Sequence, residues 1–203
     1  MDIALIVSGG ILIGCVIALS WFAGTDAPFV PTKMDQIRKI LKLAGVKKGK
    51  KFYELGSGDG RVVFEAAKLG ANSIGIEQSW LRVLYSRYKA QKLALHPKGV
   101  NVSFYHGDIF NPSFWHHRTS LRGASSDVAI FRGRLPRPLG ARNDILITDA
   151  DVIYIYLLSK GVKKLEEKLK EELKKKAVVI TQTYHFPNWK PFKKLGDFWF
   201  YSQ

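Results

Sequence analysis

Apolar and polar residues alternate along most of the chain in patterns that predict α/β secondary structure. Residues that recur every three to four positions on one apolar face predict helices at 34–44, 61–69 and 161–176. Short apolar runs predict strands at 51–55, 73–76, 100–105, 177–182 and 198–201. Because strands and helices alternate, we expect an α/β domain with a mainly parallel sheet and flanking helices, its last strand returning antiparallel.

The first 25 residues follow a different pattern. No charged residue lies between Ile3 and Thr25, and about 21 of these positions are largely apolar, a length that suits one membrane-spanning helix. A cleaved signal peptide is the alternative, but Asp2 stands where such a peptide carries positive charge. We therefore predict a transmembrane anchor at 1–25, in which Gly10 and Gly14 have the spacing of a weak helix-dimer contact.

The distribution of charged residues predicts the orientation of this anchor in the membrane. The chain carries a formal net charge of +15, and lysine and arginine dominate the linker and basic amphipathic helix predicted at 26–50. The positive-inside rule then places the domain at 51–203 on the cytoplasmic side of a single-pass membrane protein. Such a surface attracts acidic partners, including anionic lipid headgroups. The single cysteine, Cys15, excludes an intramolecular disulfide framework.

The fourth strand has two candidates, 127–131 and 151–158. We favour the second because a helical pattern follows it directly, as the alternation of strand and helix requires. The intervening segment, 112–148, is an atypical insertion that holds six of the ten arginines and no lysine. It is interpreted either as a loop that contacts substrate or RNA, or as a disordered, functionally silent insertion or a segment read in an altered frame.

A glycine-rich loop carries the candidate chemistry. Gly56, Ser57, Gly58 and Gly60 follow the strand at 51–55 and precede a helix, an arrangement that lets the backbone approach a nucleotide-like ligand. Glu54 lies just upstream of this loop. Glu77 ends the next strand, 17 residues after Gly60, where an acid can bind a ribose. Asp108 follows the third strand.

This spacing resembles the class I S-adenosylmethionine-dependent methyltransferases, which have a Rossmann-like sheet. The resemblance implies that Glu54 and the loop residues 56, 57, 58 and 60 surround the methionine part of S-adenosylmethionine. It also implies that Glu77 binds the ribose and Asp108 the adenine amino group. A Rossmann-like fold that has lost this ligand, or binds another nucleotide, is the alternative.

Two flanking motifs are similar to a narrower branch of that superfamily. The segment Pro28-Phe29-Val30-Pro31-Thr32 and the tryptophan-containing loop at 186–191 resemble the archaeal protein-lysine methyltransferases. They also resemble the mitochondrial enzymes that act on the ATP synthase c subunit and the adenine nucleotide translocase. The implied activity is membrane-anchored methylation of accessible protein lysines, including those of membrane proteins. A nucleic acid substrate is disfavoured.

The substrate side of the site is less defined by sequence. Tyr154 and Tyr156 alternate on one strand face, so they either line a lysine channel or belong to the core. No metal is expected, because His116 and His117 have no partners at ligand spacing. Two other functions remain open: methylation of a lipid or small hydrophobic molecule, and a non-catalytic membrane adaptor with a basic surface.

Overall fold

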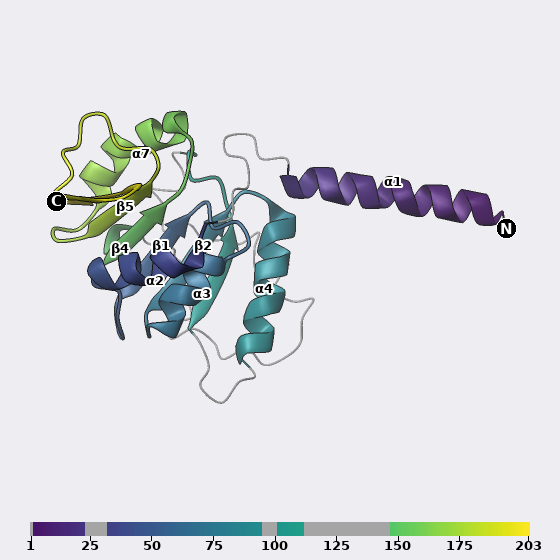
Figure 1. Ribbon diagram of the computed structural model, residues 1–203, viewed down its shortest axis with the longest axis horizontal. Coiled ribbons are helices and arrows are strands. Elements are labelled where there is room, and N and C mark those ends of the chain that lie inside the picture. Colours follow the sequence, from purple (N-terminus) through teal and green to yellow (C-terminus); the bar gives the residue numbers. More distant parts are fainter. Residues whose placement is uncertain (1, 23–31, 95–100, 112–146) are drawn as a thin grey trace.

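The strands of the described residues form one sheet. The computed structural model describes residues 2–22, 32–94, 101–111 and 147–203 (Figure 1). Within these residues the strand order is β3-β2-β1-β4-β5-β7-β6, with β1 to β5 parallel and β7 antiparallel to β5 and β6. The strands are β1 (Lys51–Leu55), β2 (Asn72–Glu77), β3 (Val102–His106), β4 (Val152–Ile155), β5 (Val178–Gln182), β6 (Lys193–Leu195) and β7 (Phe198–Ser202).

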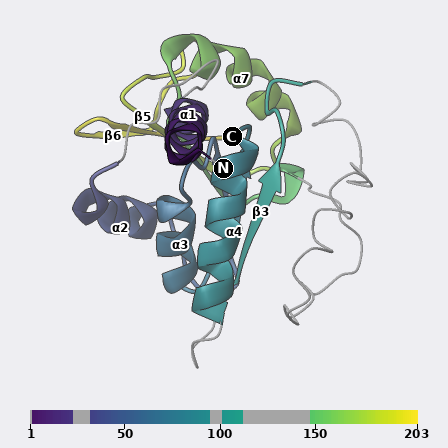
Figure 2. The same cartoon turned by 90° about the vertical axis from the view of Figure 1, so that its right-hand side faces the viewer.

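Helices cover both faces of this sheet. One face is covered by α2 (Met34–Leu43), α3 (Arg61–Lys68) and α4 (Trp80–Ala94), which form one layer in Figure 2. The other face is covered by α7 (Ser159–Glu172), whose Val162, Leu165 and Leu169 are fully buried. Since the burial of apolar surface drives folding, the alternating side chains of the central strands complete a core on each side.

The centre of the sheet is also where its strand order reverses. β1 pairs with β2 on one side and with β4 on the other, so the chain leaves β1 in one direction and later returns on its opposite flank. In open parallel sheets this reversal leaves a crevice beyond the carboxyl ends of the strands, where ligands bind. The glycine-rich loop follows β1 directly and therefore lies at this point.

The predicted elements are largely confirmed, with different boundaries. β1 has the predicted bounds, and β4 confirms the choice of the later candidate for the fourth strand. β3 begins two residues later than expected, and α7 begins and ends earlier. α4, the 3-10 turn Ile147–Asp149 and β6 were not anticipated. The linker 26–31, the alternative strand at 127–131, His116, His117 and nearly all of the insertion lie outside the described residues.

The N-terminal helix α1 (Ile3–Phe22) extends away from the domain in Figure 1. Among the described residues, no helix combines the length and the hydropathy of a membrane span. The predicted transmembrane anchor is therefore not supported by the structure. The dimer contact at Gly10 and Gly14 also stays a prediction.

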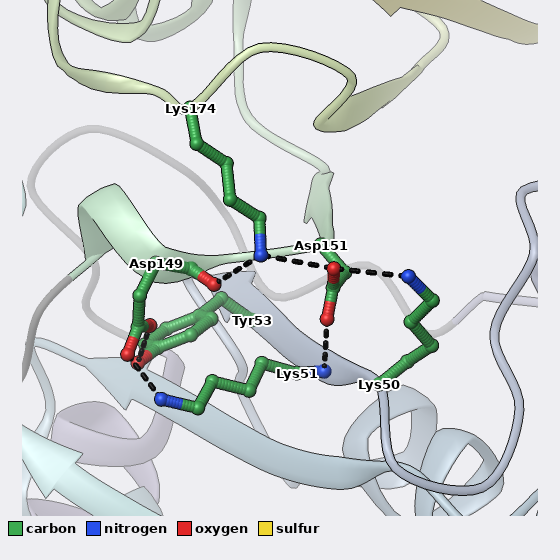
Figure 3. A network of polar contacts seen from close by, with 6 residues as sticks. All are labelled: Lys50, Lys51, Tyr53, Asp149, Asp151 and Lys174. Carbon is green, nitrogen blue, oxygen red and sulfur yellow. Dashed lines mark hydrogen bonds and ion pairs between the residues drawn. The ribbon is translucent and has the colours of Figure 1, made fainter.

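An ion-pair network joins β1 to β4 at their amino ends (Figure 3). Asp151, which precedes β4, accepts hydrogen bonds from the Lys51 backbone N–H at 2.8 Å, from Lys174 Nζ at 2.9 Å and from Lys50 Nζ at 3.1 Å. Asp149 accepts from Lys51 Nζ and from the Tyr53 hydroxyl. One carboxylate thus holds the start of β1, the start of β4 and the segment after α7 together.

These contacts control the ionisation of Asp151. Partial burial by itself raises its pKa, but the hydrogen bond from Lys51 and the ammonium groups of Lys174 and Lys50 outweigh this and lower the pKa to about 2. An unfolded aspartate titrates near 3.9. The ionised carboxylate therefore stabilises the fold above about pH 4, and this contribution is lost as the pH falls towards 2.

Asp151→Asn is expected to remove this pH-dependent stability. Near neutral pH the variant should unfold with a free energy about 1 to 2 kcal/mol below that of the wild type. The difference should shrink as the pH is lowered from 6 to 3, because the wild type loses the same interaction. Urea titrations of both proteins at pH 6 and at pH 3 measure this difference in the free energy of unfolding. Asp197→Asn, at an exposed turn, is the matched control, and an equal effect of both substitutions would contradict the assignment.

Candidate functional site

The glycine-rich loop is folded tightly against the end of β2. Gly56, Gly58 and Gly60 have φ values of 84°, 54° and 76°, in the left-handed region that L-residues with side chains rarely adopt. The N–H groups of Gly56 and Ser57 both donate to Ile76 O at 2.9 Å. The backbone conformation of this loop therefore depends on glycine at these positions.

Glu54 is a buried acid at the base of the loop. Its residue is 5% exposed, and its Oε2 has no hydrogen-bond partner among the described residues. Burial raises its pKa well above the ordinary range, and the nearby carboxylates of Asp59 and Glu77 raise it further. The Val63 N–H at the start of α3 and the Arg61 guanidinium lower it only in part. A cationic ligand group beside Glu54 would satisfy the orphaned oxygen and favour its ionised form.

Glu77 ends β2 with its carboxylate turned toward the loop. Its Oε2 accepts a hydrogen bond from the Gly58 N–H at 2.8 Å, and its Oε1 accepts from the Ser79 N–H at 2.9 Å. The buried Arg82 on α4 also reaches Oε1, at 3.3 Å. Because a carboxylate oxygen can accept two hydrogen bonds, Glu77 keeps capacity for ligand hydroxyls while it braces the loop.

Asp108 lies after β3, beside the same edge of the sheet. The Gly107 N–H donates to Glu77 O at 3.1 Å, which joins the ends of β2 and β3. Asp108 itself is exposed, and its Oδ1 accepts the Phe110 N–H at 2.9 Å, the pattern of a side-chain-capped turn. Its contact with an adenine amino group stays a prediction.

Tyr154 of β4 and Tyr156, one residue after the end of β4, lie on the face covered by α2. The Tyr154 ring is fully buried in the core cluster with Ile37, Phe52 and Ile180, while Tyr156 is partly buried against that cluster. The Tyr154 ring is therefore a core element, which is one of the two alternatives that the sequence left open, and a substrate role of Tyr156 stays a prediction. Its hydroxyl lies at the carboxyl end of the strand and donates to Gln182 Oε1.

Three polar residues of this region were not anticipated from the sequence. Arg82 is 4% exposed and pairs with Glu77, and Thr32 donates to Gln182 Oε1 at 3.3 Å. Neither contact leaves a pattern in the sequence, since Thr32 and Gln182 are 150 residues apart. An arginine inside the otherwise apolar start of α4 was the one available signal. Within the described residues, no group of three or more potential metal ligands occurs.

These residues fit a nucleoside ligand that carries positive charge. Two buried atoms at the loop, Glu54 Oε2 and Ser57 Oγ, have no hydrogen-bond partner among the described residues, and contacts with such a ligand would satisfy them. S-adenosylmethionine has an ammonium group and a sulfonium for the acidic side of the site and ribose hydroxyls for Glu77. The donor and acceptor set therefore suits this cofactor.

Comparisons with known proteins agree with the chemistry of this site. No family model matches the chain. Over 170 residues it is 31% identical to the human lysine N-methyltransferase of the ATP synthase c subunit, covering 84% of this chain and 57% of that protein. It is 24% identical to a protein-lysine N-methyltransferase of Saccharolobus islandicus, covering 81% of both chains. The chain thus spans little more than half the length of the human relative.

Solved structures define the fold. An RNA methyltransferase from Salinibacter ruber, crystallised with S-adenosylhomocysteine, superposes with a TM-score of 0.61 and 27% identity over 85% of this chain and 91% of that one. A methyltransferase from Thiobacillus denitrificans, also crystallised with S-adenosylhomocysteine, superposes with a TM-score of 0.52 and 16% identity over 88% of this chain and 58% of that one. The chain has the Rossmann-like fold of the S-adenosylmethionine-dependent methyltransferases. The predicted resemblance, including its protein-lysine branch, is confirmed by these relatives.

Glu54→Gln is expected to weaken the binding of S-adenosylmethionine at least tenfold, because the neutral amide cannot pair with a cationic ligand. In the wild type, affinity should rise with pH as Glu54 loses its proton, and in the variant this rise should be smaller. Calorimetric titration between pH 5 and 8 measures both effects. Glu167→Gln, on the exposed side of α7, is the control. Equal affinities and pH profiles in all three proteins would refute the role of Glu54.

Proposed function

We propose that this protein transfers methyl groups from S-adenosylmethionine to lysine side chains of proteins. The observation that carries the proposal is the buried, partly unpartnered Glu54 beneath a glycine loop, in a chain similar over 170 residues to lysine N-methyltransferases. Glu54 would hold the charged amino acid end of the cofactor, together with Gly56, Ser57, Gly58 and Gly60. Glu77 would bind the ribose and Asp108 the adenine.

The bound cofactor supplies an electrophilic methyl group on a sulfonium. The chain's part in the reaction is to align an amine with that group and to keep water out. A free lysine titrates near 10.4, so its amine must lose a proton before it can attack. Buried surroundings favour the neutral amine. The apolar cluster around Tyr154, next to Glu54 in the strand pairing, provides such surroundings without a dedicated base.

RNA is the second candidate substrate. It is favoured by the 27% identity to the Salinibacter ruber RNA methyltransferase and by the net charge of +15, which attracts phosphate backbones. Methylation of a lipid or other small hydrophobic molecule, and a non-catalytic adaptor role, are the further alternatives. Each predicts a different acceptor of the methyl group, or none.

A labelled-methyl experiment separates these substrates. The full chain is incubated with methyl-labelled S-adenosylmethionine and, separately, with purified ATP synthase c subunit, a membrane extract, a soluble extract and total RNA. We expect label in protein, recovered as methyl-lysine after acid hydrolysis, and at least tenfold less of it with Glu54→Gln at a cofactor concentration below saturation. Label in RNA or in extracted lipid alone would replace the lysine assignment. Cofactor binding with no transfer to any acceptor would contradict an enzymatic role.

We also propose that α1 attaches the protein to a membrane, with the domain on the cytoplasmic side. The apolar side chains along α1 are exposed, Ile3, Leu5 and Leu19 to 70% or more, and no charge lies between Ile3 and Thr25. Water-exposed apolar surface of this extent is unfavourable, so a lipid environment would stabilise it. The basic residues after the segment support the orientation. A tether of this kind would concentrate the enzyme near membrane proteins.

Membrane fractionation tests this attachment. The full chain, expressed in bacteria, is expected to remain in the membrane pellet after washes with high salt and with alkaline carbonate. Replacing Leu5, Leu12 and Leu19 with lysine should release it. Recovery of the wild type in the salt wash would instead indicate that its basic surface alone holds it to lipid, and recovery in the initial supernatant would exclude attachment.

A further inference from the structure

A small polar cluster lies at the carboxyl ends of β4 and β5, next to Glu54. It consists of Thr32, which precedes α2, Tyr154 of β4 and Gln182 of β5. Thr32 Oγ1 donates to Gln182 Oε1 at 3.3 Å, and the Tyr154 hydroxyl donates to the same oxygen. Thr32 is 9% exposed and Tyr154 is fully buried. Three segments far apart in the sequence thus converge on one amide oxygen.

The strand register places this cluster beside the proposed cofactor site. Glu54 and Tyr154 are direct partners in the β1–β4 pairing, so their side chains lie on the same face of the sheet. Tyr154 is in turn the partner of Ile180 on β5, and Gln182 follows on the same face two residues later. Glu54 is close enough to raise the pKa of the Tyr154 hydroxyl, after the larger effect of burial, so that hydroxyl keeps its proton.

The directions of the hydroxyl protons determine which further hydrogen bonds the cluster can form. The Tyr154 proton is directed to Gln182 Oε1, and the Thr32 hydroxyl lies within hydrogen-bonding reach of both Gln182 Oε1 and the Tyr154 hydroxyl. A hydroxyl that donates its proton still presents lone pairs as acceptors. The cluster is therefore a pair of hydrogen-bond acceptors held by one amide. A neutral primary amine carries two N–H donors and one lone pair, so two fixed acceptors also fix the direction of that lone pair.

The backbone after Gln182 is held in an unfavourable conformation. Thr183 has a φ of 67°, in the left-handed region that is costly for a β-branched residue. Its N–H donates to Asp197 O at 2.7 Å, and the Tyr184 N–H donates to Gln182 O at 2.8 Å. Strain of this kind persists where the surrounding structure fixes a position, and it is common beside functional sites. It fixes the end of β5 and thereby the Gln182 side chain.

We propose that Thr32 and Tyr154 receive the substrate lysine amine and that Gln182 positions their hydroxyls, an inference that rests on the proposed methyltransferase function. The amine, having released a proton to solvent, donates its two N–H groups to Thr32 Oγ1 and Tyr154 Oη. Its lone pair forms the new N–C bond while the S–C bond breaks, and sulfur keeps the electron pair. The product is a methylammonium and a neutral thioether.

This geometry also sets the degree of methylation. A monomethylated amine has one N–H donor fewer, so it cannot satisfy both acceptors and is held less well than the unmethylated amine. Tyr154→Phe and Thr32→Val each remove one acceptor with little change in shape. Each variant should lower kcat/KM for the first methylation at least tenfold and raise the ratio of dimethyl- to monomethyl-lysine in the product. The affinity for S-adenosylmethionine should stay within twofold of wild type.

Two further variants test the role of Gln182 and the specificity of the tyrosine effect. Gln182→Leu should reproduce the loss of kcat/KM, and Gln182→Glu should restore most of it, because a carboxylate oxygen still accepts both hydroxyl protons. Tyr53→Phe is the matched control. Tyr53 is also a buried tyrosine with a hydroxyl bonded to a side-chain oxygen, that of Asp149, but at the opposite end of the sheet. It should leave the rate and the product ratio unchanged.

The measurements use the full chain, purified ATP synthase c subunit and a lysine-rich histone as acceptors, calorimetry for cofactor binding, and mass spectrometry for methylation states. Variants that behave like the wild type would overturn the inference. So would variants that lose thermal stability and activity together at an unchanged product ratio, since the cluster would then be structural. A wild type that binds S-adenosylmethionine but forms no methyl-lysine would refute the proposed function itself, and this inference with it.

Discussion

The pairing of β1 with β4 is the constraint on which the rest of the molecule depends. β1 and β4 are neighbours at the point where the strand order reverses. β2 and β3 come between them in the sequence but lie on the other side of β1, so the pair forms only when the chain returns to β1. At the amino ends Asp151 fixes the pair through the Lys51 N–H and two ammonium groups. At the carboxyl ends the same register sets Glu54 beside Tyr154. A shift by one residue would move every side chain to the opposite face.

This register buries the carboxyl group of Glu54 at a cost in stability. A buried carboxyl group with a raised pKa opposes folding above the pH at which it ionises in the unfolded chain. The neighbouring Asp59 and Glu77 add to that cost, whereas the Val63 N–H offsets only part of it. An apolar residue would pack there without this penalty. A cationic ligand beside Glu54 would offset this cost, and a sulfonium cofactor carries the charge that the proposed site needs.

Much of the fold could be predicted from the sequence, because β1 and α3 have clear periodic patterns flanked by glycine. α4 could not, since its apolar residues do not gather on one face: Trp80, Leu84 and Tyr88 are exposed while Val83 is buried. In the candidate site, Glu77 was predicted from its place at a strand end, and Glu54 through the resemblance to methyltransferases. Thr32, Arg82 and Gln182 were not, because their contacts depend on tertiary packing that local spacing does not record.

The same packing links the substrate side of the site to the stability of α2. Ile37, Ile40 and Leu41 bury one face of α2 on the cluster that also holds the Tyr154 ring, and Arg38 pairs with Glu65 of α3. Thr32 lies two residues before this helix, so its hydroxyl reaches Gln182 only when α2 is docked. The cofactor loop, by contrast, is fixed by β1, β2 and α3. Loosening of α2 should therefore disturb the proposed amine contacts at Thr32 and Tyr154 more than the conformation of the glycine loop, although α2 also packs on α3 through Arg38 and Glu65.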